Sequence, residues 1–373
     1  MISIKEVKTK KELKQFIRFP RRLYKDCPYY VPSLESEEYQ VLTAHPAKSF
    51  CTVRLWMALK NGRIAGRIGG VINQRYNELK SKKRIRFGWF DVDDDIEVAK
   101  ALLSTVENWG WEENLIEISG PSRYSNMEKQ GMLVEGFDML TTISSDYNYP
   151  YYPRFMNELG YKKEEDYLQM KVEIKEIPER IKNLSHKISE RYGIKTKEFK
   201  TKKDISNYAK QFFGALNDSF VNVYNFIPLT DSEIDYLIKT NFSMVDKDLI
   251  MVLVDENDHV VGFCLSVPSL SKAFRKASGK LFPFGWYHIL KALKKNDTLD
   301  LYLTGVLPQW INRGIHVLYH DQLHQNSLER GYKFAITTQQ SESSQSYRIW
   351  EKYGGELFSK RRCYLKQLTL ISD

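Results

Sequence analysis

The order of apolar and polar residues predicts the same series of secondary-structure elements twice along the chain. Short apolar runs bounded by polar turns are typical of strands, and apolar residues spaced three or four apart are typical of helices. In the C-terminal half the predicted strands cover residues 194–199, 249–255, 260–268, 298–306, 333–339 and 363–368. The predicted helices cover residues 202–216, 231–242, 314–331 and 343–354. Strands that alternate with helices indicate an α/β unit with a mixed sheet.

The N-terminal half follows the same pattern, with a strand at 83–92, a helix at 96–114 and a strand at 115–121. The matching helix of the C-terminal half is expected to end at Gly331, because glycine readily adopts the left-handed conformation of a helix C-cap. Its buried face is expected to carry Ile315, Leu318, Tyr319, Gln322 and Leu323.

Three pairs of short segments recur in the same order, which implies that the chain arose by duplication. EVKTKKELKQF at 6–16 matches EFKTKKDISNY at 198–208, with an offset of 192 residues. Two strand–turn–strand segments place Gly66 and Gly262 at an offset of 196, and two helix ends place Gly160 and Gly354 at an offset of 194. We therefore expect tandem units at residues 1–175 and 176–373. The seam is expected near residues 172–178, and a charged helix within 177–193 is expected to join the units.

Composition changes this picture little. A chain of 373 residues exceeds the size at which a single core stops growing, in agreement with two domains. The net charge of +9 favours an anionic partner, although simple solubility explains it equally well. The lysines and arginines follow no nucleic-acid reading motif, so we expect no nucleic-acid partner. Four cysteines without a CxxC pair and the lack of a long apolar segment lead us to expect a cytoplasmic protein.

The strongest candidate for chemistry is the segment GVLPQWINRGIHVLYHDQL at 305–323. It reads as a strand, a proline turn, a loop and a glycine where a helix begins, and free amides at such a helix start bind phosphate oxygens. The segment resembles the acyl-CoA-binding motif of the GNAT acyltransferase superfamily, whose loop has the pattern Q/R-x-x-G-x-G/A. Gly314 matches the first glycine, whereas Ile311 and His316 depart from the other two positions.

This resemblance implies an acyl-CoA co-substrate bound at the C-terminal unit. The strand end would hold pantetheine, and the loop would hold pyrophosphate, with Arg313 as a cation. The implied binding residues are Val306, Leu307, Asn312, Arg313, Gly314, Ile315 and His316. In the N-terminal half the matching loop carries Asp91, Asp93, Asp94 and Asp95, which would repel phosphate. Aspartates are good helix caps, so we expect a purely structural helix start there.

Catalytic residues are harder to assign. GNAT enzymes often use a tyrosine as general acid, but its usual position falls on Trp350 here, so Tyr347 is the substitute we expect. The general base could be Glu342, Asp300, His316 or His320, and we favour Glu342 and His316. His316, His320 and His324 lie on one side of a helix, but no carboxylate or cysteine motif completes a zinc site. We therefore expect no metal.

Residues 271–295 form an unusually long connection that mixes lysines and arginines with aromatic residues. Such a composition is typical of segments that contact an anionic membrane surface, and we expect this surface to be that of the inner membrane. The alternative is a lid whose aromatic residues are buried against the N-terminal unit. A lid over a lipid-binding cleft would combine both properties.

Longer segments extend the resemblance to nearly the whole chain. FPRRLYKDCPYYVPSLESE, IEISGPSRYSNMEKQGMLVEGFD, YNYPYYPRFMNELGYKK, KLFPFGW, GVLP and RRCY are similar to segments of a bacterial GNAT-type family that includes ceramide synthase-like proteins. The resemblance implies an N-acyltransferase that uses acyl-CoA and an amine, in particular a long-chain base. The alternative hypothesis is a non-catalytic acyl-CoA or lipid-binding protein with a relic site.

Overall fold

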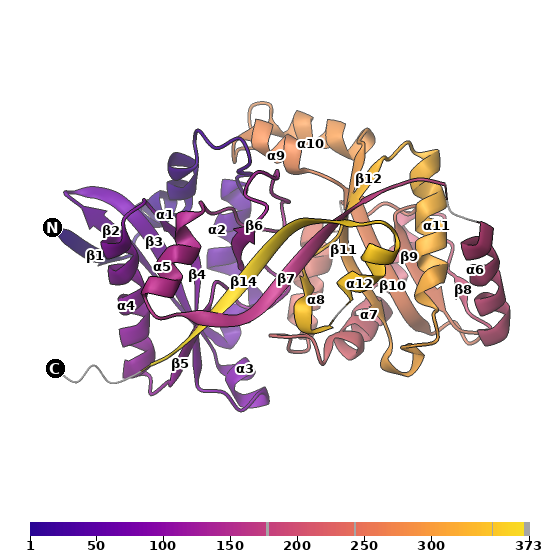
Figure 1. The fold of residues 1–373 in the computed structure, drawn as a ribbon, viewed down its shortest axis with the longest axis horizontal. Helices are drawn as coiled ribbons and strands as arrows, with labels where there is room; N and C mark the ends of the chain where they lie inside the picture. The colour runs from indigo at the N-terminus through magenta and orange to yellow at the C-terminus, as the bar shows by residue number, and fades with distance from the viewer. Residues whose placement is uncertain (177–178, 242–243, 345, 369–373) are drawn as a thin grey trace.

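The computed structural model describes residues 1–176, 179–241, 244–344 and 346–368 as one mixed α/β molecule (Figure 1). Its helices are α1 (Lys10–Leu23), α2 (Glu35–Ala44), α3 (Gln74–Leu79), α4 (Ile96–Glu112), α5 (Tyr151–Glu158), α6 (Glu179–Tyr192), α7 (Lys202–Phe220), α8 (Asp231–Asn241), α9 (Ser271–Ala277), α10 (Gly285–Lys294), α11 (His316–Glu329) and α12 (Tyr347–Lys352). No described helix has the length and apolar character needed to cross a membrane.

The strands form one continuous sheet in the order β1-β2-β3-β4-β5-β14-β7-β12-β11-β10-β9-β8, with β6 and β13 paired beside it. Their bounds are β1 (Ile2–Glu6), β2 (Cys51–Lys60), β3 (Arg63–Asn73), β4 (Arg84–Val92), β5 (Glu117–Gly120), β6 (Met132–Glu135), β7 (Lys162–Glu173), β8 (Lys195–Thr196), β9 (Ile250–Val254), β10 (Val260–Pro268), β11 (Thr298–Val306), β12 (Phe334–Ile336), β13 (Gln340–Ser341) and β14 (Glu356–Gln367). The mixed α/β architecture expected from the sequence is confirmed.

The repeated sequence KTKK has a physical role at the start of each unit. Thr9 and Thr201 are the N-caps of α1 and α7, and each side chain accepts a hydrogen bond from the backbone N–H three residues later. In turn, the side chains of Glu12 and Asp204 each accept a hydrogen bond from the backbone N–H of the cap residue at 2.8 Å. Both helices therefore begin in a capping box, which satisfies amides that a helix start leaves unpaired.

The elements of the two halves follow the expected order, with several corrections at their edges. The strand predicted at 194–199 is only Lys195–Thr196, and the last strand begins at Glu356 rather than at residue 363. Gln322 is exposed, so it does not belong to the buried face of α11. Gly331 has the expected left-handed conformation, with φ of 76°. Parts of the predicted linker and seam, at 177–178, lie outside the described residues.

The two halves exchange their last strands. β7, the final strand of the first half, pairs with β12 of the second half, and β14 pairs with β5 of the first half. β7 and β14 also pair with each other and run side by side through the centre of the molecule (Figure 1). The boundary after residue 175 therefore stays a prediction about the repeats, because each half of the sheet contains a strand from the other half.

Each half contains a fork, where two parallel strands pair at one end and then separate. In the N-terminal fork, β4 and β5 pair over three residues, ending at Arg86 and Ser119. In the C-terminal fork, β11 and β12 pair over three residues, ending at Asp300 and Ile336. Ligands of open α/β sheets bind where neighbouring strands part. The forks are therefore the places where a site is expected.

Candidate functional site

The loop between β11 and α11 has a backbone suited to an anion. Asn312 and Gly314 have φ of 67° and 74°, so the chain alternates into the left-handed region on either side of Arg313. Within the part of the chain that the structure describes, the amides of Asn312, Gly314 and Ile315 have no hydrogen-bond partner. Turns of this kind point several N–H groups to one side and bind phosphate or other anions.

Helix α6 packs next to this loop. A Cβ added at Gly314 would lie 3.2 Å from Cδ1 of Ile188. Tyr192, at the end of α6, meets Trp310 edge to face at 5.9 Å between ring centroids. The Arg313 guanidinium lies 4.8 Å from the Trp310 ring centroid and has no carboxylate partner among the described residues. The loop therefore carries an available cation beside its free amides.

Asp300 occupies the apex of the C-terminal fork. Its side chain is 4% exposed, and neither carboxylate oxygen receives a hydrogen bond of good geometry from the described residues. Burial raises the pKa of the Asp300 carboxyl to about 7, while the nearby Ser269 hydroxyl opposes part of the rise. A buried carboxyl without a partner is costly in a folded protein, so its presence indicates a function. A pKa near 7 suits a general base.

Helix α2 of the N-terminal half faces the same region. The charges of Asp300 and Glu37 both raise the pKa of the Tyr302 phenol on β11, although burial is the largest cause. Burial also raises the pKa of Glu37 to about 7, and the charge of Lys129 opposes this rise. The following residue, Glu38, lines a cavity of the N-terminal half. Helix α2 therefore contributes residues both to this cavity and to the surroundings of Tyr302.

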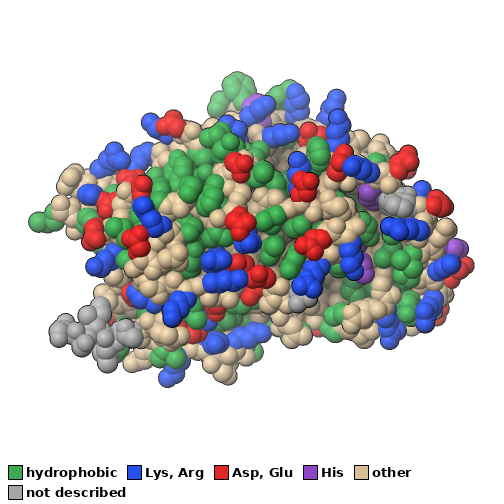
Figure 2. All heavy atoms as spheres, in the orientation of Figure 1, with side chains coloured by type: hydrophobic (Ala, Val, Ile, Leu, Met, Phe, Trp, Pro, Cys, Tyr) green, Lys and Arg blue, Asp and Glu red, His purple; other side chains and the backbone are tan. Residues whose placement is uncertain are grey.

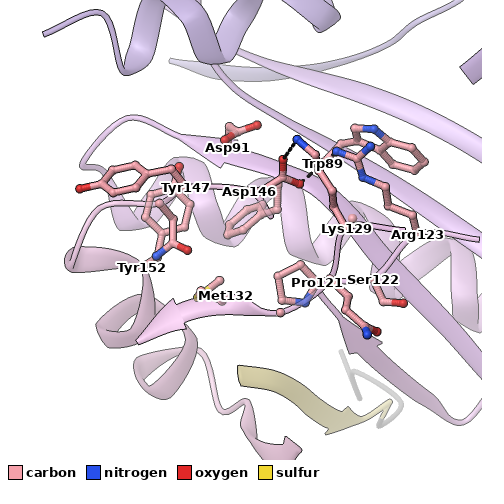
Figure 3. Close-up of a pocket in the computed structure, with 15 residues that line it drawn as sticks. Trp89, Asp91, Pro121, Ser122, Arg123, Lys129, Met132, Asp146, Tyr147 and Tyr152 are labelled. Carbon is pink, nitrogen blue, oxygen red and sulfur yellow. Dashed lines mark hydrogen bonds and ion pairs between the residues drawn. The ribbon is translucent and has the colours of Figure 1, made fainter. Parts of the chain in front are cut away.

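The cavity lies in the N-terminal fork and was not predicted (Figure 3). It has a volume of about 30 Å³, enough to hold water, and a second cavity adjoins it, because Asp91, Asp146 and Tyr147 line both. Four stretches far apart in the sequence supply its walls: β4, the segment 121–132, the segment 146–148 and Tyr152 of α5. The second cavity adds residues from 17–38.

Asp146 is the centre of a charge network in this cavity. Its two oxygens accept hydrogen bonds from Lys129 Nζ at 3.1 Å and Arg123 Nη2 at 3.0 Å, as the dashed lines in Figure 3 show. These two cations hold the pKa of Asp146 below its ordinary value against the effect of burial. The Asp146 side chain nevertheless keeps 46% of its accessible surface. It is a permanent carboxylate with an open face.

Two orphaned polar atoms also belong to the cavity walls. Arg123 Nε and Gln130 Oε1 are buried without a hydrogen-bond partner among the described residues. Asp91 is buried on the far wall, where it accepts bonds from Arg67 Nε at 2.7 Å and the Tyr24 hydroxyl at 2.9 Å. The cavity is therefore polar, nearly charge-balanced and able to take a small group that both donates and accepts hydrogen bonds.

The loop after β4 differs from the loop after β11. Asp95 caps α4 by accepting a hydrogen bond from the amide of Glu97 at 3.1 Å, as expected for a structural helix start. Asp93 and Asp94 form ion pairs with Arg63 and Arg154. The placement of Asp91 in this loop was wrong, because it is buried within β4. The strand predicted at 83–92 already contained Asp91, and the pairing of Asp91 with Arg67 in the sheet shows that Asp91 belongs to β4 rather than to the loop.

Comparison with known proteins identifies this architecture. No protein-family model matches the chain. A tandem GNAT protein from the clavulanic acid biosynthesis pathway matches 100% of this chain and 100% of its own, with a TM-score of 0.57 at 10% identity. A GCN5-related N-acetyltransferase from Sphaerobacter thermophilus matches 98% of this chain and 96% of its own, with a TM-score of 0.55 at 12% identity. The chain has a tandem GNAT fold.

Two relatives are similar over most of this chain. Protein YghO of Escherichia coli (strain K12) is 26% identical, and the match covers 96% of this chain and 94% of the relative. The bacterial ceramide synthase of Caulobacter vibrioides (strain NA1000 / CB15N) is 29% identical, and the match covers 79% of this chain and 77% of the relative. The expected resemblance to the GNAT superfamily is confirmed at the level of the fold.

The structure brings some of the predicted GNAT site residues together and leaves others apart. His316 begins α11 at the loop, and burial lowers the pKa of its imidazole. Tyr347 begins α12, whose Trp350 contacts His320 of α11 at 4.7 Å between ring centroids. Glu342 is exposed, and its carboxylate forms an ion pair with the Lys163 ammonium of β7 at 2.5 Å. The roles of all three stay predictions, and geometry favours Asp300 over Glu342 as base.

The predicted pantetheine strand needs one refinement. The amide of Leu307 donates to the carbonyl of Val261 at 2.9 Å, so it is already bonded to β10. Because amides alternate in direction along a strand, those of Thr304 and Val306 point to the open side, toward β12. Among the described residues, no group of three or more His, Cys, Asp or Glu side chains is arranged to hold a metal ion.

Proposed function

We propose that this protein is an acyl-CoA-dependent N-acyltransferase whose C-terminal GNAT unit binds the acyl-CoA. The observation that carries the proposal is the C-terminal fork, with an unpartnered Asp300 at its apex and free amides in the loop beyond it. The tandem GNAT fold and the similarity to a bacterial ceramide synthase support it.

In this proposal the loop 312–316 holds the pyrophosphate of acyl-CoA. The free amides of Asn312, Gly314 and Ile315 donate to phosphate oxygens, and Arg313 adds a positive charge. Gly314 permits the left-handed turn that aims these amides. Pantetheine follows the open edge of β11 near Val306 and Leu307, which directs the thioester toward the apex of the fork.

The reaction is direct attack of an amine on the thioester carbonyl. The ammonium form must first lose a proton, and Asp300 accepts it, because a buried carboxyl with a pKa near 7 combines basicity with a supply of the ionised form at neutral pH. The amides of Thr304 and Val306 stabilise the oxyanion of the tetrahedral intermediate. The thiolate of CoA then leaves as the amide forms, with Tyr347 as the candidate proton donor.

We propose further that the cavity at Asp146 receives the polar head of the acceptor. A carboxylate with an open face suits an ammonium group, and the orphaned Arg123 Nε and Gln130 Oε1 suit hydroxyl groups beside it. Lys129 connects the cavity to helix α2, whose Glu37 influences Tyr302 near Asp300. The cavity must widen to admit the head group. A long-chain base with an amine and hydroxyl groups fits this chemistry.

A second candidate function is acyl-CoA or lipid binding without catalysis. It is favoured by Trp350, which stands at the usual place of the GNAT general acid and is packed in the core. A thiolate is nevertheless a good leaving group without an acid. Binding of palmitoyl-CoA without turnover across a broad panel of amines would support this second function.

Thermal-shift titration with CoA, acetyl-CoA and palmitoyl-CoA tests the proposed co-substrate, because a ligand that binds only the folded state raises the melting temperature. Stabilisation by palmitoyl-CoA well beyond that by acetyl-CoA supports transfer of a long acyl chain. The absence of a shift with all three ligands contradicts the proposed site.

A further inference from the structure

Helices α9 and α10 form a hairpin, residues 271–295, that carries only positive charge. It contains seven Lys or Arg residues and no Asp or Glu, and all seven are exposed: Lys272, Arg275, Lys276, Lys280, Lys291, Lys294 and Lys295. Among described residues, only Lys272 of these seven has an acidic partner, Asp297 at 3.3 Å. The α9–α10 hairpin is therefore a concentrated and mostly unneutralised cationic surface.

Large apolar side chains project from the same hairpin into solvent. Phe282 and Phe284 are 77% and 70% exposed in the turn between the helices. Trp286, Tyr287 and Leu290 of α10 are about half exposed. Figure 2 shows apolar and basic side chains gathered at the upper edge of the molecule, over α9 and α10. Exposed aromatic residues at this density are unusual on a soluble protein surface and mark an interaction site.

The inner face of the hairpin is already used for packing. Phe274 is buried with Val31 and Leu34 of the N-terminal half, and Ile289 and Leu293 are partly buried against the same cluster. The amide of Glu35 donates to the carbonyl of Gly279 at 2.9 Å. The lid alternative therefore applies to this inner face, whereas the outer face projects into solvent, with Lys272 paired to Asp297 and the Trp286 indole N–H bonded to the carbonyl of Pro283.

We propose that the outer face of the α9–α10 hairpin docks on the surface of an anionic lipid bilayer. Lysine side chains reach phosphate and acidic headgroups while aromatic rings insert at the boundary of the acyl chains. Neither property alone requires a membrane. The combination on one short hairpin favours a bilayer, because the lysines and arginines follow no nucleic-acid reading motif and an acidic protein would match only the charges.

The inner face of the hairpin also borders the second cavity. A Cβ at Gly279 would lie 3.0 Å from Cδ of Arg21 and 3.1 Å from the carbonyl of Ser33. Both residues line the second cavity, which continues to Asp146. The docking itself goes beyond the proposed transferase function and holds even if no acyl transfer occurs.

Sedimentation with vesicles tests the proposal without any substrate. The full chain is mixed with vesicles of neutral phosphatidylcholine and with vesicles that contain phosphatidylglycerol as well. We expect binding to the anionic vesicles that falls as salt is raised, and little binding to the neutral ones. Equal binding to both compositions, or binding to neither, overturns the proposal.

Two pairs of variants locate the surface. Phe282→Ser with Phe284→Ser removes the apolar tip, and Lys291→Glu with Lys294→Glu reverses two charges. Each pair is expected to weaken vesicle binding at least about tenfold. The controls lie on α6, far from the hairpin in Figure 1: Leu184→Ser, and Lys182→Glu with Lys187→Glu, all at exposed positions. Equal losses in hairpin and control variants contradict docking by the hairpin.

The proposal and the transferase function fail separately. If vesicles do not bind but palmitoyl-CoA still raises the melting temperature, only the docking is wrong. If vesicles bind through the hairpin but no acyl-CoA does, only the proposed function is wrong. If the hairpin variants change the KM for an amine while vesicle binding stays unchanged, the hairpin is a lid and the docking proposal is overturned.

Discussion

Arg86 and Asp300 occupy equivalent positions at the apices of the two forks. Each is the last of three residues in its parallel strand pairing. Arg86 is held by the carbonyl of Tyr124 at 2.9 Å and Oδ1 of Asn225 at 2.7 Å. Asp300 has no such partner among the described residues. One apex of the duplicated fold is filled by a bonded cation, and the other presents a free carboxyl.

Asp300→Asn is expected to lower kcat/KM for acyl transfer by about 10² to 10⁴, the usual contribution of a general base. In the unchanged protein, kcat/KM should rise with pH toward a plateau above about pH 7, because only the ionised carboxyl accepts a proton. Initial rates of CoA release from pH 5 to 9 measure both effects.

Glu342→Asn is the matched comparison, since Glu342 is the exposed base that the sequence favoured. It should retain nearly full activity. If Glu342→Asn lowers kcat/KM as much as Asp300→Asn does, the general base is Glu342 of η4 (Glu342–Ser344), and the assignment to Asp300 of β11 is refuted.

Asp300 should also make stability depend on pH. The pKa of its carboxyl is raised in the folded state. The stability that this carboxyl contributes in its protonated form is therefore fully present below about pH 4 and is lost as pH rises through about 7. The asparagine of Asp300→Asn cannot ionise, so the variant does not lose this stability. The difference in free energy of unfolding, variant minus unchanged protein, should therefore rise between pH 4 and 8, by at most about 4 kcal/mol. Urea denaturation at several pH values tests this. A constant difference would show that Asp300 is not buried as a raised-pKa carboxyl.

Gly314→Glu is expected to abolish acyl-CoA binding, because the side chain would carry a negative charge into the anion site and crowd Ile188. Gly331→Glu is the control, since Gly331 has a similar φ of 76° and open space around it. It carries the same left-handed strain without touching the loop. Calorimetric titration with palmitoyl-CoA should give no binding for the first variant and unchanged binding for the second; unchanged binding for both removes the loop from the site.

Asp146→Asn should raise the KM for the amine at least about tenfold and leave the affinity for acyl-CoA unchanged, because a charge-assisted contact to the ammonium is lost. Asp138→Asn, an exposed aspartate that precedes it in the sequence, serves as the control. If the amine KM is the same in all three proteins, the cavity does not bind the acceptor.

Asn225→Gly is expected to lower the free energy of unfolding by about 2 to 3 kcal/mol, because it removes the acceptor of a buried arginine that crosses between the halves. Glycine accepts the φ of 64° at this position, so the loss reports the hydrogen bonds rather than strain. The exposed Asn222→Gly should change stability much less. Equal effects in denaturant titrations would show that Arg86 does not depend on Asn225.

The sequence predicted local features well. Periodicity located β10 and β11 to the residue, and the repeated KTKK segment marked the start of both units, because capping boxes and amphipathic faces are written in neighbouring residues. The Gly314 loop was likewise visible as a glycine between a strand and a helix. The left-handed conformation of Asn312 was not predicted, since several residue types can occupy such a turn.

Long-range features were not predicted. The cavity at Asp146 unites four separate segments between Gly88 and Tyr152, and its aspartate and arginine are ordinary charged residues in the sequence. The exchange of β7 and β14 also has no local signal, because either strand could close either half of the sheet. Asp300 was among the candidate bases, but only its burial without a partner separates it from Glu342.

The most direct test of the central claim is detection of the amide product. The purified protein is incubated with palmitoyl-CoA and a panel of amines that includes long-chain bases, and mass spectrometry follows the amide while a thiol reagent follows CoA. We predict stoichiometric formation of amide and free CoA, strongly reduced in Gly314→Glu and Asp300→Asn. Tight binding of palmitoyl-CoA with no amide from any amine would contradict the account and favour a non-catalytic binding protein.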